Sequence, residues 1–283
     1  MSSTTTSRSS AERIAAFRDL HRSGCFVSPN PWDPGSARLL AQMGFKALAT
    51  TSSGFAWSVG RSDNHVTLEQ ALEHCRTMAG VVELPVSADF EGGFAVDPAQ
   101  VAVNVVRAAE TGIAGLSVED STGDPARPLH DYDLAVERIR AARRALTASG
   151  TGLLLTARTE GFIVGRPDLA ETVRRLAAFA EAGADCLFAP GIRTDGEITA
   201  VVRAVAPRPV NLLVGNGFIS LARAEALGVR RISVGGALAR VAWGAFLGAA
   251  EGIAGSGTFT RLDGAVPFAR IDGAFAPPGG PPA

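Results

Sequence analysis

The sequence predicts a single (β/α)8 barrel, and three observations support this fold class. The chain has 283 residues and is 46% hydrophobic, a size at which α/β barrels commonly fold as one unit. Short apolar runs alternate with longer amphipathic segments eight times. Glycines such as Gly112 and Gly183 stand where a helix is expected to end and the next strand to begin, a position that favours glycine. The alternation indicates a parallel sheet covered by helices, and eight units indicate closure; an open doubly wound sheet is the alternative.

The expected elements follow from these runs. The predicted strands are Gly24–Val27, Ala47–Thr51, Val86–Asp89, Gly115–Glu119, Leu153–Arg158, Cys186–Ala189, Val210–Leu213 and Arg231–Val234. The predicted helices include Ser36–Met43, Pro98–Thr111, Leu134–Ala148, Asp168–Ala182 and Glu197–Val205. In a barrel of this class the functional residues gather where the strands end.

The two ends of the chain differ in composition from the segment between them. Residues 1–11 are rich in Ser and Thr and are predicted to form a disordered tail. Residues 12–256 form the predicted barrel, and residues 257–283 form a C-terminal extension with a Pro/Gly-rich end.

Charge and cysteine content exclude several function classes. Basic and acidic residues number 27 and 28 and are spread along the chain, so no nucleic-acid-binding surface is expected. No run of about 18 uncharged apolar residues is present, so no membrane span is expected. Cys25, Cys75 and Cys186 match neither a disulfide framework nor a metal site, which is typical of a cytoplasmic protein. Lys46 is the only lysine and precedes a predicted strand, which argues against Schiff-base chemistry at the strand ends.

Acidic side chains follow two neighbouring strands at the point where each is predicted to end. Asp89 and Glu91 are two residues apart after one strand, and Glu119 ends the next. Three carboxylates in a small space provide the oxygen environment that Mg²⁺ prefers. The alternative is that one or two of them cap a helix or pair with an arginine. We therefore expect metal ligands at Asp89, Glu91 and Glu119, with Mg²⁺ as the ion and Mn²⁺ as a second candidate.

Further polar residues at the strand ends suit a small carboxylate substrate. Arg158 ends the fifth predicted strand, where its guanidinium would bind a carboxylate through two parallel hydrogen bonds; the alternative is an internal salt bridge to Glu119 or Glu160. Hydroxyl and backbone N–H groups are offered after the second strand by Ser52, Ser53 and Gly54, although a simple turn explains that segment almost as well.

Several motifs, taken together, resemble those of the isocitrate lyase/phosphoenolpyruvate mutase superfamily. They are Asn30-Pro-Trp-Asp-Pro-Gly-Ser-Ala, Thr50-Thr-Ser-Ser-Gly, Ser87-Ala-Asp-Phe-Glu-Gly-Gly, Ser117-Val-Glu-Asp, Thr156-Ala-Arg-Thr-Glu, Pro209-Val-Asn and Arg231-Ile-Ser-Val-Gly-Gly-Ala. They cover about residues 12–252, in the expected order and at the expected strand ends. The Pro209-Val-Asn motif places Asn211 at the seventh strand, where it is predicted to bind substrate.

The resemblance implies a barrel that assembles as a homo-oligomer, dimer or tetramer, with the eighth helices exchanged between paired subunits. It also implies Mg²⁺ and chemistry next to a 2-oxo acid or its enolate. Asp89 and Glu91 would then be metal ligands, and Glu119 would act through a metal-bound water. The carboxylate would be held by Ser53, Gly54 and Arg158. Asp63 would correspond to the aspartate of the mobile loop after the second strand.

Three departures from the family pattern concern its acid–base residues. The usual Asp-x-Asp metal motif is here Asp89-x-Glu91. The Lys-Lys-Cys-Gly-His loop of the lyase branch is missing, and no lysine follows the fourth strand, as the mutase and phosphonopyruvate-hydrolysing branches would require. After the sixth strand, Ala189-Pro190-Gly191 stands where relatives often have Glu or His. Candidates for the missing acid or base are Asp63, His130 and His65, although a loop histidine is more often only a surface residue.

The leading hypothesis is a Mg²⁺-dependent carbon–carbon lyase or decarboxylase that acts on a small 2-hydroxy or 2-oxo carboxylate through a metal-bound enolate. The first alternative is phosphorus–carbon chemistry of the phosphoenolpyruvate mutase or phosphonopyruvate hydrolase type. The second is a barrel that binds ligands without catalysis. The third is phosphate binding by the backbone of Val234-Gly235-Gly236, where the glycines otherwise serve close strand–helix packing.

Overall fold

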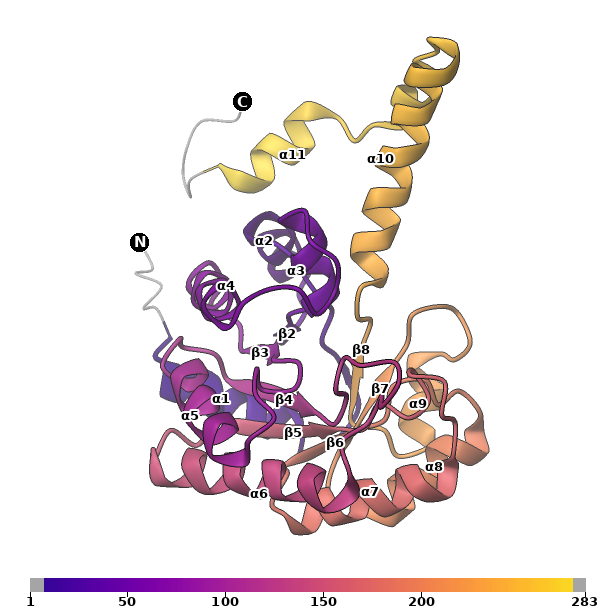
Figure 1. Ribbon diagram of the computed structural model, residues 1–283. Helices are drawn as coiled ribbons and strands as arrows, with labels where there is room; N and C mark the ends of the chain where they lie inside the picture. The colour runs from indigo at the N-terminus through magenta and orange to yellow at the C-terminus, as the bar shows by residue number, and fades with distance from the viewer. Residues whose placement is uncertain (1–7, 277–283) are drawn as a thin grey trace. The chain divides into compact units, whose positions relative to one another are not determined.

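The structure, a computed structural model, describes residues 8–276, which divide into two compact units that meet between Gly236 and Ala237. The first unit holds eight parallel strands in the order β1-β8-β7-β6-β5-β4-β3-β2 (Figure 1). Their bounds are Phe26–Val27, Leu48–Ala49, Val86–Asp89, Gly115–Glu119, Leu154–Arg158, Cys186–Phe188, Val210–Leu213 and Arg231–Ser233 for β1 to β8. The predicted (β/α)8 barrel class is confirmed.

Asn30 joins the two edges of this curled sheet. β1 and β2 are not linked by a ladder of their own, but the Ala49 N–H donates to the carbonyl of Pro29 at 3.0 Å. The Asn30 Nδ2 donates to the Thr50 carbonyl at 2.7 Å, and its Oδ1 accepts from the N–H of Val234 at 2.8 Å. Because this buried side chain, in the segment after β1, bonds to the segments after β2 and β8, it holds the sheet closed.

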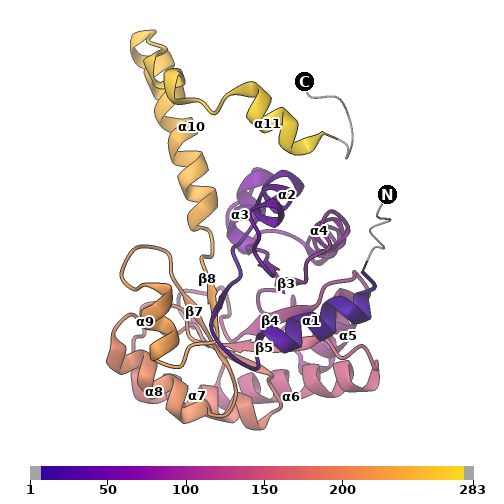
Figure 2. The same ribbon diagram turned by 180° about the vertical axis from the view of Figure 1, so that it is seen from behind.

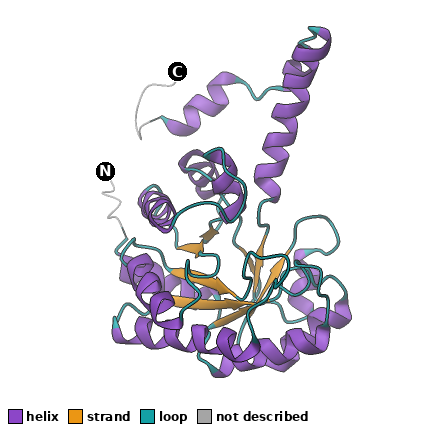
Figure 3. Cartoon of the chain, viewed as in Figure 1, coloured by secondary structure: helices purple, strands orange, loops and turns teal. Residues whose placement is uncertain are grey.

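Helices alternate with the strands and lie on the outside of the sheet (Figure 3). The helices of the first unit are α1 (Ser10–Leu20), α2 (Pro34–Gln42), α3 (Ser52–Ser58), α4 (Leu68–Gly80), α5 (Pro98–Ala109), α6 (Tyr132–Ala148), α7 (Leu169–Glu181), α8 (Asp195–Val205) and α9 (Leu221–Ala226). Most begin at side-chain caps; Asp33, for example, accepts from the Ser36 N–H at the start of α2, as expected of a good N-cap residue.

Helix α1 covers the N-terminal ends of the strands. Its buried residues Ile14 and Phe17 pack in one cluster with Ala114 and Leu154, at the start of β4 and β5, and Figure 2 shows α1 beside these strands. The helix begins at Ser10, capped by Ser9, so its first two residues fall within the predicted tail of residues 1–11. Residues 1–7 and 277–283, assigned to the two tails, lie outside the described residues.

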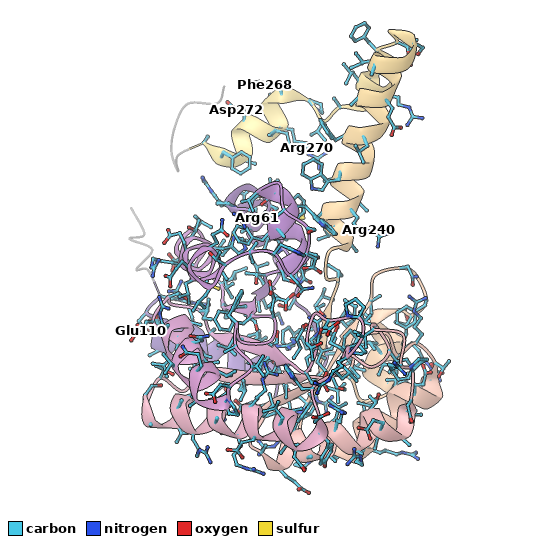
Figure 4. The ribbon with its side chains drawn as sticks, viewed as in Figure 1. Arg61, Glu110, Arg240, Phe268, Arg270 and Asp272 are labelled. Atoms are coloured by element: carbon cyan, nitrogen blue, oxygen red, sulfur yellow. The ribbon has the colours of Figure 1, made fainter. Side chains whose placement is uncertain are left out.

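The second unit contains α10 (Ala237–Ser256), a 3-10 turn (Thr260–Gly264) and α11 (Phe268–Phe275). The side chains of Phe268, Arg270 and Asp272 project from α11 (Figure 4). By length and composition alone α10 could cross a membrane, with a mean hydropathy of 1.2. It contains Arg240 and Glu251, and such charges are costly within a bilayer. The absence of a membrane span therefore stays a prediction.

Candidate active site

A polar cavity of about 190 Å³ lies at the carboxyl ends of the strands. Its wall includes the strand-end residues Asp89 and Arg158, the loop residue Asp63, and Ser52 and Ser53 at the start of α3. A cavity of about 150 Å³ is enough to hold benzene, so this one suits a ligand of a few carbon atoms. The predicted position of the site, at the strand ends, agrees with this cavity.

Arg158 is surrounded by carboxylates. Its Nη1 lies 3.2 Å from Oδ1 of Asp89 and 3.3 Å from Oε2 of Glu119, and its Nε donates to Oε1 of Glu160. Strand pairing explains part of this cluster, because Glu119 and Arg158 are partners in the β4–β5 register. The internal ion pair that the sequence left as an alternative is therefore present.

The cluster carries more negative than positive charge. Burial raises the pKa of Glu119 well above its usual value; Arg158 opposes this, and nearby carboxylates add to it. Burial also raises the pKa of Glu160, again against the effect of Arg158. For Arg158 itself burial lowers the pKa, but the three carboxylates raise it by more. One guanidinium does not neutralise the cluster, so the site favours a further cation or protons.

The segment Ser52–Gly54 is the first turn of α3 and not an open loop. Ser52 donates to Oδ2 of Asp89 from its N–H at 3.1 Å and from its hydroxyl at 2.9 Å. Ser53 lines the cavity, with its Oγ 3.1 Å from Oγ1 of Thr51. The Gly54 N–H donates to the same Thr51 oxygen at 3.3 Å, and Gly54 is not among the lining residues. The structure thus brings Ser52 and Ser53, but not Gly54, to the cavity.

Asp63 reaches the cavity from the loop between α3 and α4. Burial raises the pKa of its carboxyl, and the charge of Asp89 raises it further. Its placement beside Arg158 and Ser52 in the lining agrees with the prediction that Asp63 belongs to the site.

Glu91 faces a neighbouring cavity of about 470 Å³, which it lines with Glu119, His65 and His130. The backbone of Glu91 is left-handed, with φ 45°, which turns the side chain away from the direction expected of an extended strand end. Burial, followed by the charge of Asp89, raises the pKa of Glu91 to about 8. Glu91 thus lines one cavity with Glu119 and also shares a small pocket with Asp89, whereas only Asp89 of the three predicted metal ligands lines the cavity that contains Arg158.

His130 lies outside the cavity that contains Arg158. Its N–H donates to the Asp120 carbonyl at 2.9 Å, and its own carbonyl accepts from Nη1 of Arg175 at 3.0 Å. Burial, with the charge of Arg138, lowers the pKa of its imidazole to about 4. His130 lines the cavity that Glu91 and Glu119 line, not the one that Arg158 lines, and its catalytic role stays a prediction.

Asn211 lines the cavity from β7, but neighbours already engage its side chain. Its Nδ2 donates to Oγ of Ser233 at 2.9 Å, and its Oδ1 accepts from Nε of Arg231 at 2.9 Å. Arg231 also lines the cavity and was not predicted as a site residue. The sequence contained a signal for Arg231. It lies two positions before Ser233 in the predicted strand, so both side chains face the same side of the sheet.

Comparisons with known proteins identify the family of this chain. The family model for phosphoenolpyruvate phosphomutase matches residues 17–254. The chain belongs to this family. A solved Burkholderia cenocepacia protein, assigned as a lyase or mutase, is 49% identical with a TM-score of 0.92, over 95% of this chain and 98% of that chain.

Two further relatives carry functional names. Oxaloacetate decarboxylase of Pseudomonas aeruginosa is 29% identical over 228 residues, 77% of this chain and 77% of the relative. The solved structure of oxaloacetate acetylhydrolase in complex with the product oxalate is 27% identical with a TM-score of 0.82, over 93% of this chain and 94% of that chain. The predicted superfamily, and with it an enzyme of the lyase or mutase type, is confirmed.

The carboxylate cluster of this phosphoenolpyruvate phosphomutase-family enzyme fits a divalent metal ion. Within residues 8–276 no three Asp, Glu, His or Cys side chains already stand at metal-binding spacing, and Arg158 contacts oxygens of Asp89 and Glu119. Carboxylate oxygens are nevertheless the ligands that Mg²⁺ prefers, and it commonly uses only one or two of them and keeps several waters. The excess of negative charge favours a cation at the same place.

The backbone of Val234-Gly235-Gly236 gives no support to the phosphate-binding alternative. The N–H groups of Val234 and Gly235 donate to Oδ1 of Asn30 at 2.8 and 2.9 Å, so both donors are occupied. A Cβ at Gly236 would lie 2.9 Å from Oγ of Ser53. Close packing, the other interpretation of these glycines, accounts for Gly236.

Two buried arginines that support the site were missed by the sequence analysis. Arg138, on α6, donates to the carbonyl of Glu119 at 2.9 Å and to that of Gly92. Arg175, on α7, donates to Oδ2 of Asp120 at 3.0 Å. Each ties a helix to the loops at the strand ends. The sequence signal for both residues was their position on the buried face of an amphipathic helix, where an arginine is unexpected.

Proposed function

We propose that this enzyme is a divalent-metal-dependent carbon–carbon lyase or decarboxylase that acts on a small 2-oxo or 2-hydroxy carboxylate through an enolate. One observation carries the proposal: a small cavity at the strand ends is lined by Arg158, Asp89 and the hydroxyls of Ser52 and Ser53. In support, two relatives are named for oxaloacetate, a small 2-oxo acid.

Arg158 is the proposed anchor of the substrate carboxylate. It is held in place by three carboxylates and by Phe188, whose ring centroid lies 5.3 Å from its Cζ. Its Nε and Nη2 already donate to Glu160, and its Nη1 lies against Asp89 and Glu119. A ligand carboxylate would therefore form the two-point contact that arginine favours by displacing one of these carboxylates. The hydroxyls of Ser52 and Ser53 lie in the same wall and would orient the bound acid.

Asp89, Glu91 and Glu119 are the proposed ligands of Mg²⁺, with Mn²⁺ as a second candidate. Asp89 and Glu119 already adjoin Arg158, whereas Glu91 faces the neighbouring cavity. When bound, the ion would supply stabilisation of the negative charge that develops on the substrate oxygen.

The proposed reaction breaks one carbon–carbon bond of the substrate. The departing fragment leaves as CO2 in a decarboxylation, or as a carbonyl compound in an aldol cleavage, in which its hydroxyl proton passes to a base or to solvent. The bonding electrons pass into the enolate, whose charge Arg158 helps to neutralise. The enolate carbon then takes up a proton. Asp63 lines the cavity and has a carboxyl pKa raised by burial, so it is the proposed proton donor. Decarboxylation suits this site because it requires less assistance from an acid than aldol cleavage does.

We also propose that the protein is a homo-oligomer in which α10 exchanges between subunits. The support is the exposure of its large apolar side chains, with Trp243, Phe246 and Leu247 exposed by 37%, 59% and 51%. Apolar surface of this kind marks interfaces. Light scattering of the purified protein tests the assembly; a monomer at micromolar concentration would contradict it.

The function is tested by calorimetry with oxalate, which resembles the enolate of pyruvate, in Mg²⁺ and in EDTA. We expect oxalate to bind only with Mg²⁺, and Asp89→Ala and Arg158→Ala to abolish binding. Arg208→Ala, which changes an exposed arginine before β7, is the matched control. A screen of 2-oxo, 2-hydroxy and phosphonate acids then identifies the reaction. Failure of the wild-type protein to bind either oxalate or the metal ion would refute the proposal.

A further inference from the structure

The interior of the barrel directly below the carboxylate cluster is polar. Three hydroxyl residues lie two positions before the cluster residue of their own strand. They are Ser87 before Asp89, Ser117 before Glu119, and Thr156 before Arg158. Residues two apart in a strand face the same side, so these hydroxyls form the next inward layer. Barrels of this class usually fill such layers with Val, Ile and Leu. A buried hydroxyl layer in their place needs an explanation beyond packing.

Arg231 extends from β8 into this layer. Only 4% of the residue is exposed. Its Nε donates to Oδ1 of Asn211 at 2.9 Å, its Nη2 donates to Oγ1 of Thr156 at 3.1 Å, and its Nη1 lies 3.5 Å from Nε2 of His21. Each nitrogen of the guanidinium therefore has one partner, and all of these partners are neutral in charge: an amide, a hydroxyl and an imidazole whose pKa burial lowers to about 3.

The two arginines that line the cavity differ in their counter-charges. Arg158 is paired with three carboxylates. Arg231 forms no ion pair with any Asp or Glu of residues 8–276. A buried cation without a counter-ion is costly. Both arginines line the same cavity, so a ligand bound there would reach Arg231.

We propose that Arg231 forms an anion subsite at the inner end of the cavity and holds the distal carboxylate of the substrate. Arg158 would hold the carboxylate next to the reacting carbon, as the proposed function has it, and this inference rests on that proposal. Hydroxyls of Ser87 and Ser117 lie in the same lining and would solvate the distal group. Arg231 is then the residue that selects diacids over monoacids.

The test compares matched ligand pairs by calorimetry with Mg²⁺ present. Each pair differs only in a distal carboxylate or methyl group: oxaloacetate with 2-oxobutyrate, and 2-oxoglutarate with 2-oxovalerate. For at least one pair we expect wild-type protein to bind the diacid roughly tenfold to 100-fold more tightly, the range for hydrogen bonds to a charged group. In Arg231→Met this ratio falls to about one, whereas oxalate, which lacks a distal group, binds as before. Arg208→Met is the control.

Several outcomes would overturn the subsite: a wild-type protein without preference in either pair, or a preference that survives in Arg231→Met. Arg231→Gln, which keeps a donor for Asn211 but loses the charge, serves if the Met variant does not fold. A crystal structure of the wild-type protein with the preferred diacid is independent of both variants, and a distal carboxylate away from Arg231 would refute the inference. Failure of oxalate to bind would instead count against the proposed function, because the paired comparison does not depend on oxalate.

Discussion

Glu91 offers a quantitative test of the excess negative charge. Burial and the charge of Asp89 raise its pKa to about 8 in the folded protein, against about 4.3 in an unfolded chain. Between these values the folded state keeps a proton that the unfolded state releases, so stability is complete below about pH 4.3 and is lost as the pH rises towards about 8. At pH 7 the difference amounts to about 4 kcal/mol of unfolding free energy. Glu91→Gln, which mimics the protonated form, avoids this loss.

The assay is urea denaturation of wild type and Glu91→Gln in EDTA, from pH 5 to pH 9. We expect the variant to gain about 4 kcal/mol over wild type at pH 7, with a gap that closes towards acid pH. Glu110→Gln, at an exposed position after α5 (Figure 4), is the matched control and should show no such trend. A gap that does not grow with pH would refute the reasoning. If Glu91 also ligates Mg²⁺, adding the ion stabilises wild type more than the variant.

The remaining predictions concern three other positions. Arg158→Met should lower the free energy of unfolding by about 3–5 kcal/mol, because it leaves buried carboxylates unpaired; urea titrations should show a smaller loss at acid pH, and an unchanged stability would contradict the ion cluster. Asn30→Ala should cost about 2–4 kcal/mol by the same assay, since three backbone groups lose their partner. Gly115→Ala places a Cβ 2.8 Å from Cε1 of Phe17 and should cost about 1–3 kcal/mol by overpacking, measured as a lower Tm, whereas Gly196→Ala, with only a 4.0 Å contact, should be neutral.

The strands were predictable because burial on both faces makes them nearly continuous apolar runs. Val86–Asp89, Gly115–Glu119 and Val210–Leu213 match to the residue. Helices near the N-terminus were harder to predict. The Ser/Thr-rich start of the chain concealed the capping box that begins α1 at Ser10, and the Ser-Ser-Gly start of α3 contains poor helix formers, so tertiary packing decides its conformation.

The site was predictable to the extent that strand ends determine it. The adjacent register of β4 and β5 brings Glu119 to Arg158, and that follows from strand order. The direction of Glu91 does not, because a left-handed backbone at a residue other than glycine has no signature in the sequence. The arginines at 138, 175 and 231 were missed for a related reason: their partners are backbone carbonyls, an amide or a carboxylate far away in the chain.

Helix α1 has a consequence for how the cavity is insulated. Phe17 lies with its ring centroid 5.8 Å from Cζ of Arg231, and His21 stands 3.5 Å from the same guanidinium. The first helix of the chain therefore covers the N-terminal end of the barrel, although it contributes no group to the cavity lining. Without α1, bulk water would reach the N-terminal ends of the strands and screen the charge of Arg231. The dielectric environment of the innermost arginine is thus set in part by a helix that lies more than two hundred residues before it in the chain.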